Sequence, residues 1–234
     1  MTQLPGYSCE VCTHAGEWRI SLGGEIDMAT TPLVDAVLRL AQADALTVQL
    51  NLQAVSFIDS SGVALLLRAQ RRAHNNDNEF ALSDPAPRVR RLLELCAVEQ
   101  ALDIRDEEPW DHNDWVRRHA LIATDLEGTV IHWNRDAEAL YGYGAQAALG
   151  RPARDLLVAP ADNDDARTTM QSLRTQGRWQ GAFNLARCDG TTFRAWVRDI
   201  VMHDGNGRPC GLLGLSVAMT ELPSAVDPAP RRAA

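Results

Sequence analysis

A strand followed directly by an apolar helix constrains the fold of this 234-residue chain more than any other feature. Apolar and polar residues alternate through Leu46, Val48, Leu50 and Leu52, which is the pattern of a strand with one buried face. The segment Ser60–Ala73 then reads as a helix, and its first half is almost wholly apolar, which predicts that this half is buried. A buried helix directly after a strand indicates a sheet whose strands are joined by crossover helices.

The alternation of strands and helices continues on both sides of this unit. A strand is predicted at Trp18–Leu22 and a short one at Phe80–Leu82. One helix is predicted to begin at Thr31, with Thr31 as N-cap and Pro32 in the first turn. Another is predicted after Asp84-Pro85. This order favours an α/β domain with parallel strands and crossover helices.

An acidic, polar stretch from Arg105 to Trp115 separates two halves of different character. It predicts a first domain at residues 1–105, a linker at 106–116, a second domain at 117–221 and a disordered tail at 222–234. Because few contacts usually cross a polar linker of this kind, we expect the two domains to be separable.

The second half begins with short elements and ends with long ones. Two short strands are predicted at Leu121–Thr124 and Val130–Trp133. Small helices are expected between residues 136 and 157, and a further helix near 166–176. Longer strands joined by hairpin connections are then predicted at Trp179–Arg187, Thr191–Met202 and Gly211–Met219.

Composition excludes several classes of function. The chain has 31 acidic and 23 basic residues and a net charge of −8, which disfavours non-specific binding to nucleic acid or to anionic membranes. Every basic residue is Arg, and the absence of Lys excludes a Walker-type phosphate loop, a lysine Schiff base and the strand lysine of a protein kinase. The sequence has no nucleotide-binding glycine loop and no metal–carboxylate cluster, so we do not expect an enzyme.

Apolar stretches are short, and the longest lies around Val63–Leu67, whereas a membrane span needs about 20 residues. The segment Met1–Gly6 lacks the positive start and apolar core of a signal peptide. The 5 Cys are odd in number and scattered, which favours a reduced environment. We therefore expect a cytoplasmic protein.

The pair Cys9 and Cys12, with His14 nearby, raises the question of a metal or redox site. The surrounding segment, Tyr7–Thr13, is predicted to be an edge strand, on which residues three apart point to opposite faces. No second Cys pair is present to complete a zinc site. We therefore predict no metal site.

The motif Asp59-Ser60-Ser61-Gly62 lies between the clearest strand and the buried helix, where a Ser can be merely an N-cap. Its wider setting carries more information. The segment Gly24–Asp27 before the first long helix and the segment Val55–Gly62 before the second resemble the STAS domain of bacterial anti-sigma factor antagonists. The resemblance covers roughly Tyr7–Arg105 and implies a mixed β-sheet with crossover helices.

The resemblance implies a phosphoprotein with Ser60 as acceptor. The kinase would be a partner that is also an anti-sigma factor, and a serine phosphatase would reverse the reaction. A helix N-terminus tolerates a phosphate, whereas the nearby Asp27 and Asp59 would repel it, so we expect phosphorylation to change what this surface binds rather than the fold. Ser61 is the competing acceptor and is expected to cap the backbone, and Gly62 is expected to let a partner's backbone approach. Asp27 is alternatively a plain turn residue.

The second half resembles a PAS domain over roughly His119–Thr220. The matching residues are Ala123–Asn134, Ala137–Tyr143, Leu149-Gly150, Trp179 with Gly181, and Arg187 with Asp189-Gly190-Thr191. The resemblance implies an α+β fold, with an antiparallel five-stranded sheet and small helices. It also implies a sensor or dimerisation module, and hence a PAS-mediated homodimer as one partner arrangement.

The residues limit which cofactor such a domain could hold. Light-sensing flavin PAS domains carry a reactive Cys that Arg151–Leu157 lacks, and the helix near 166–176 has no His to ligate haem. We therefore predict no cofactor and leave the PAS ligand open. Trp133 and Trp196 either line a pocket or fill the core, and the core is favoured. His132 is expected to be a surface or edge residue rather than a ligand.

Together these patterns predict a bacterial signalling protein that acts in transcription regulation and stress response, as an anti-anti-sigma factor. In this interpretation the unphosphorylated STAS half binds the anti-sigma kinase and frees a sigma factor, and the PAS half senses a signal or mediates dimerisation. The alternative is a STAS scaffold subunit of a stress-sensing complex. In such complexes the sensor usually comes first, whereas here it comes second.

Overall fold

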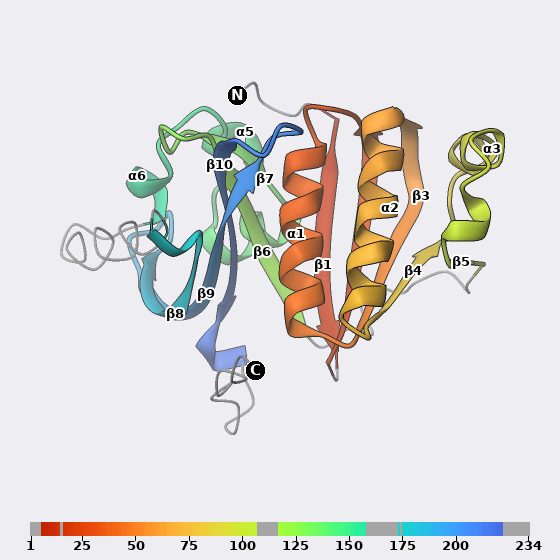
Figure 1. Cartoon of the computed structure of the whole chain (residues 1–234). Helices are drawn as coiled ribbons and strands as arrows, with labels where there is room; N and C mark the ends of the chain where they lie inside the picture. The colour runs from red at the N-terminus through yellow and green to blue at the C-terminus, as the bar shows by residue number, and fades with distance from the viewer. Residues whose placement is uncertain (1–5, 15, 107–116, 158–172, 174, 222–234) are drawn as a thin grey trace.

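The computed structural model describes residues 6–14, 16–106, 117–157, 173 and 175–221. A single sheet runs through them in the order β5-β4-β3-β2-β1-β6-β10-β9-β8, with β7 paired on β6 (Figure 1). None of the helices in this part of the chain has the length and hydropathy needed to cross a membrane.

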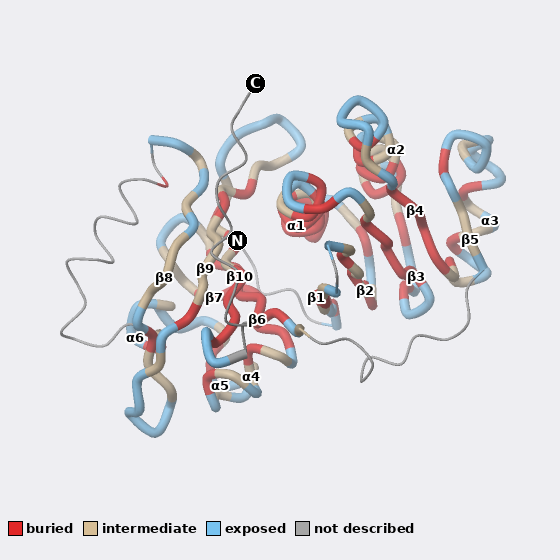
Figure 2. Tube along the Cα trace, turned by 90° about the horizontal axis from the view of Figure 1, so that it is seen from below, coloured by how far each residue is buried: buried red, intermediate tan, exposed pale blue. Residues whose placement is uncertain are grey.

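The first half has the predicted alternation of strands and helices. Its elements are β1 (Ser8–His14), β2 (Glu17–Ile26), α1 (Thr31–Asp44), β3 (Thr47–Ile58), α2 (Ser60–Asn75), β4 (Glu79–Ser83), α3 (Pro87–Leu95) and β5 (Ile104–Arg105). Strands β2 to β5 pair in parallel, and β1 pairs antiparallel with β2. Helices α1 and α2 lie side by side on one face of this sheet (Figures 1 and 2). The expected mixed sheet with crossover helices is therefore confirmed.

The second half is an antiparallel sheet with small helices, as expected. Its elements are β6 (Arg117–Thr124), β7 (Val130–Trp133), α4 (Arg135–Tyr141), α5 (Ala145–Ala148), α6 (Ala153–Leu157), β8 (Arg178–Ala186), β9 (Thr192–His203) and β10 (Pro209–Ala218). Its five strands are in the order β7-β6-β10-β9-β8. The predicted tail, nearly all of the predicted linker and most of the helix near 166–176 lie outside the described residues.

Two helix starts differ from the prediction by one or two residues. The N-cap of α1 is Thr30, and Thr31 is already helical. The N-cap of α3 is Ala86, because Asp84, the residue after β4, has a positive φ of 49° and the helix opens at Pro87. In both helices a proline sits in the first turn, where its missing N–H costs no hydrogen bond.

Strand β1 is not the edge strand that was predicted. Its residues Val11, Cys12 and Thr13 pair with His119, Arg118 and Arg117 of β6, so the sheet continues from one half of the chain into the other. An edge strand exposes unpaired N–H and C=O groups, and β6 supplies partners for them. The expectation of few contacts between the halves is therefore wrong.

The hydrophobic core also crosses between the halves. One cluster holds the residues beneath α1 and α2 together with Leu121, Met202, Leu213 and Leu215 from the second sheet. A second cluster lies on the opposite face of that sheet, against α4 to α6, and contains Trp133. We call the face toward α1 the outer face of the second sheet, and the face toward α4 its inner face (Figure 2).

Candidate functional site

Ser60 is exposed and is the first residue of α2, at the point where the chain leaves β3. Asp59 before it is the N-cap, with extended backbone angles. One oxygen of the Asp59 carboxylate, Oδ1, accepts hydrogen bonds from the N–H of Ser61 at 2.8 Å and the N–H of Gly62 at 3.1 Å. The strand, the cap and the apolar helix behind it therefore hold the Ser60 hydroxyl at the surface.

The Asp59 carboxylate is held in its ionised form. Desolvation raises its pKa, but hydrogen bonds from the Ser61 hydroxyl and from the N–H groups of Gly62, Ser61 and Met28 outweigh this and lower the pKa below its usual value. A fixed negative charge therefore stands directly before Ser60.

The structure gives Ser61 and Gly62 roles other than those predicted. The Ser61 hydroxyl does not cap the backbone, because it donates to Asp59 Oδ1 at 2.5 Å. Gly62 is buried, and a Cβ there would lie 2.5 Å from Ile58 Cγ1 and 3.0 Å from the carbonyl oxygen of Ile26. Packing inside the domain therefore accounts for this glycine, and the approach of a partner's backbone stays a prediction.

Asp27 organises the loop that precedes α1. Its Oδ1 accepts from the N–H of Ala29 at 2.9 Å, and from the N–H and the hydroxyl of Thr30 at 3.0 and 3.1 Å. This is the behaviour of a turn residue, the alternative left open above. The loop nevertheless adjoins the Asp59–Gly62 motif, because the Asp59 N–H donates to Ile26 O at 3.1 Å and the Met28 N–H helps to lower the pKa of the Asp59 carboxyl.

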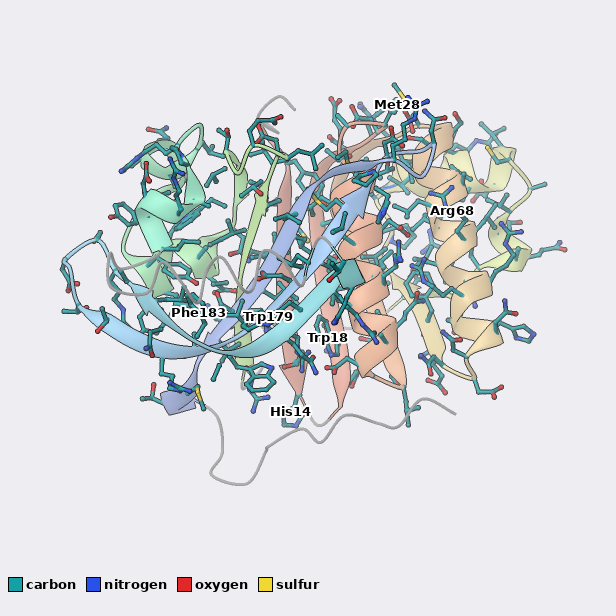
Figure 3. All side chains as sticks on the ribbon, turned by 60° about the vertical axis from the view of Figure 1, so that its left-hand side comes forward. His14, Trp18, Met28, Arg68, Trp179 and Phe183 are labelled. Atoms are coloured by element: carbon teal, nitrogen blue, oxygen red, sulfur yellow. The ribbon has the colours of Figure 1, made fainter. Side chains whose placement is uncertain are left out.

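Two exposed apolar side chains near Ser60 were not predicted. Met28 is 75% exposed, and Phe57, three residues before Ser60, is 48% exposed. Figure 3 shows Met28 at the end of the molecule where α1 begins. Large apolar groups in contact with water favour association with a partner. Phe57 is out of phase with the buried positions of β3, and this was the signal in the sequence that could have revealed its exposure. We call Asp27, Met28, Phe57, Asp59 and Ser60 the Ser60 surface.

The inner face of the second sheet carries a polar group that sequence reasoning missed. The Tyr141 hydroxyl lies 2.7 Å from Ser216 Oγ in the buried core. Asp199 lies within electrostatic range of Tyr141, and burial raises the pKa of Asp199 to about 7. Tyr141 belongs to α4, Ser216 to β10 and Asp199 to β9. Because the order of the strands brings them together, no local pattern in the sequence could indicate this group.

The two tryptophans proposed for a pocket lie on different faces. Trp133 belongs to the inner core, and its Nε1 donates to Tyr143 O at 3.1 Å. Trp196 follows Ala195, which joins the same inner core, and alternation along β9 therefore directs Trp196 to the outer face. The two do not form one pocket.

Other residues of interest turn out to be buried. His132 is 5% exposed rather than a surface residue, and burial lowers its pKa to about 4. Cys9 and Cys12 are both buried in β1, and burial raises the pKa of each thiol. Within the described ranges, no three His, Cys, Asp or Glu side chains are grouped so as to hold a metal ion.

Comparisons with known proteins bear on both halves of the chain. A family model described as "Mlab, STAS domain" matches residues 9–105, and a PAS domain model matches residues 118–221. The anti-sigma-B factor antagonist of Staphylococcus aureus (strain NCTC 8325 / PS 47) is 26% identical over 98 residues, which are 42% of this chain and 91% of the relative. The anti-sigma-B factor antagonist of Staphylococcus epidermidis is also 26% identical over 98 residues, with the same coverage.

Solved structures of PAS and LOV domains are also similar to this chain. The PAS domain of a protein from Colwellia psychrerythraea is 28% identical, covers 44% of this chain and 88% of its own, and has a TM-score of 0.42. The LOV domain of a blue-light activated histidine kinase from Erythrobacter litoralis EL346 is 21% identical, covers 43% and 94%, and has a TM-score of 0.39. The two family models agree with the topology: the chain carries a STAS domain at residues 9–105, followed by a PAS domain at residues 118–221.

Proposed function

We propose that this chain is an anti-sigma factor antagonist whose STAS domain is switched by phosphorylation of Ser60. The observation that carries the proposal is the exposed Ser60 hydroxyl at the start of α2, directly after an Asp that is held ionised. The similarity of this domain to anti-sigma-B factor antagonists supports the choice of partner. In this proposal the unphosphorylated Ser60 surface binds an anti-sigma factor that is a serine kinase.

Electrostatics explains why a phosphate would act as a switch. A phosphate adds about −1.5 to −2 charges at neutral pH. Two N–H groups at the start of α2 already donate to Asp59, so they are not free to neutralise a phosphate on Ser60. The added charge would stand beside the Asp59 carboxylate and among Met28 and Phe57, where it would disfavour an apolar contact. The modification would therefore release the partner and leave the fold intact.

The remaining parts of the proposal follow from this switch. A serine phosphatase would restore the unphosphorylated form, and the PAS domain would adjust the output in response to a signal. We place the protein in the cytoplasm, where its kinase and sigma factor would act.

Binding to the host's anti-sigma serine kinase tests the proposal. Ser60→Ala should bind the purified kinase with unchanged affinity and accept no phosphate from ATP. Ser60→Glu should bind more weakly, though less so than the phosphorylated chain, because a carboxylate carries less charge than a phosphate. Ser61→Ala is the matched control, and it should be phosphorylated like the natural chain. Equal affinity for the natural, phosphorylated and Ser60→Glu proteins would contradict the proposed switch.

A further inference from the structure

Contacts between the two domains converge on the last residue of α1. Asp44 Oδ2 accepts a hydrogen bond from Trp18 Nε1 of β2 at 3.2 Å and one from Arg198 Nη1 of β9 at 2.7 Å. The Arg198 guanidinium also lies 5.8 Å from the centre of the Trp18 ring. The Arg198 side chain is 17% exposed and the Asp44 side chain 40%, so the arginine is shielded by the domains around it while the carboxylate still meets water.

A buried histidine extends this group of contacts. The His119 ring of β6 stacks on Trp18 with ring centres 5.5 Å apart and planes inclined by 17°. Its Nε2 lies 3.0 Å from the Thr13 hydroxyl of β1. Burial lowers the pKa of His119 to about 3, so the ring is neutral under ordinary conditions. We call Trp18, Asp44, His119 and Arg198 the junction cluster, and Figure 3 labels Trp18 within it.

Helix α1 lies along the outer face of the PAS sheet from this cluster onward. Its C-terminal end meets β9 at Arg198, and Ile200 and Met202 of β9 join the core shared with α1. The 14 residues of α1 span about 20 Å, and about six residues of a strand such as β9 span the same distance. The N-terminal end of α1 therefore lies near the end of β9, and Figures 1 and 3 show the β9–β10 hairpin beside that end of the helix.

The other side of α1 is bonded to α2, the helix that begins at Ser60. Gln42 Nε2 donates to Ala69 O at 2.9 Å. Arg72 of α2 donates to Gln42 Oε1 at 2.5 Å and to Asp35 Oδ1 at 3.1 Å. At its N-terminal end, α1 is preceded by the loop that begins after Ile26, and Ile26 O accepts a hydrogen bond from the Asp59 N–H at 3.1 Å. One helix, α1, thus connects Arg198 of β9 both to α2 and to the loop beside Asp59.

We infer that α1 couples the PAS sheet to the Ser60 surface within a single chain. A shift of β9 would move α1 as a rigid body, and α1 would carry the Asp27–Thr30 loop and the start of α2 with it. The outer face of the PAS sheet is occupied by α1, so regulation would not depend on two copies pairing through that face. The inference rests on the proposed function only for what the Ser60 surface does, not for the coupling itself.

Hydrogen–deuterium exchange of the full-length chain, without any partner, tests the coupling. Arg198→Ala removes the β9 contact to Asp44 and should speed exchange of the N–H groups of Met28, Ser61 and Gly62 about fivefold or more, the lower end of ordinary coupling energies. Arg194→Ala, an exposed change on the same strand, is the matched control and should leave these rates unchanged. Asp44→Asn tests the same contact from the partly exposed helix end and should act in the same direction.

A second arm separates coupling from local loosening. Ser216→Ala removes the hydroxyl that bonds Tyr141 on the inner face of the PAS sheet. This substitution should change the exchange rates of the Met28, Ser61 and Gly62 N–H groups in the natural chain. In a chain that also carries Arg198→Ala, the same substitution should change these rates less. Changes confined to β9, β10 and the end of α1 would overturn the inference. Because no kinase is used, that result would leave the proposed phosphorylation of Ser60 unaffected.

Discussion

At the scale of single residues, the Ser60 surface depends on the packing of its neighbour Gly62, which is buried two residues after Ser60. The position of Ser60 followed from a strand and a buried helix that meet at a turn, both of which are local patterns. The role of Gly62 could not be predicted in this way, because the atoms that exclude a Cβ belong to Ile26 and Ile58 on two different strands. Local patterns cannot show such contacts between strands.

Gly62→Ala should destabilise the protein by about 1–3 kcal/mol, the usual cost of overpacking a filled core. The added Cβ would lie 2.5 Å from Ile58 Cγ1 and 2.9 Å from Ile26 Cγ2. Urea unfolding measures the change. Gly205→Ala is the control, because a Cβ at that position meets nothing within 4 Å. Equal losses in the two variants would contradict the packing explanation.

The half-buried carboxyl of Asp199 predicts a dependence of stability on pH. Burial raises its pKa from 3.8 to about 7, so the folded chain holds this proton more tightly than the unfolded chain. Stability should therefore fall as pH rises from about 4 to about 7, by at most about 1.4 kcal/mol per pH unit for this group. Burial also raises the pKa of Glu10 to about 7, so Glu10 lowers stability over the same pH range.

Asp199→Asn should remove the share of this dependence that belongs to Asp199. The drop in Tm between pH 5 and pH 8 should be smaller in the variant than in the natural chain, and the variant should be the more stable of the two at pH 8. Asp155→Asn, an exposed change on α6, should leave the drop unaltered. An unchanged drop in Asp199→Asn would show that the carboxyl is already ionised in the folded protein at pH 5.

At the scale of elements, alternation and turn residues predicted most strands and helices, but not the neighbours of β1. Alternation says that β1 is a strand, and it does not say how many partners that strand has. Its second partner, β6, is more than 90 residues away in the sequence. The two strands pair where α1 covers the apolar outer face of the PAS sheet. A strand pairing between two domains leaves no local signal in the sequence.

Asn134 joins three elements at this pairing, and its loss should cost about 1–3 kcal/mol, the penalty for buried polar groups left without partners. Its Oδ1 accepts from Leu121 N–H at 2.9 Å and Ala137 N–H at 2.8 Å, while its Nδ2 donates to Glu10 Oε2 at 3.0 Å. Asn134→Ala should therefore lower the urea midpoint. Asn206→Ala, in the exposed β9–β10 hairpin, should not. A loss in Asn134→Ala no larger than that in Asn206→Ala would refute this role.

At the scale of the whole molecule, the STAS and PAS domains share a sheet and a core, so the chain should unfold as one unit. Far-UV circular dichroism and tryptophan fluorescence should report the same urea midpoint. Proteolytic cleavage between Arg105 and Trp115 should leave two fragments that elute together in size exclusion, because β1–β6 pairing and the junction cluster persist. Two separate unfolding transitions, or fragments that elute separately, would show that the two domains are independent.

The proposed switch requires that Ser60 is phosphorylated in the living cell. Purification of the full chain from its native host, followed by phosphosite mapping by mass spectrometry, tests it most directly. We expect one phosphate, on Ser60, and an anti-sigma serine kinase that co-purifies with the unphosphorylated form only. A phosphate on Ser61 with Ser60 unmodified, or a kinase that co-purifies equally with both forms, would show that Ser60 is not the switch.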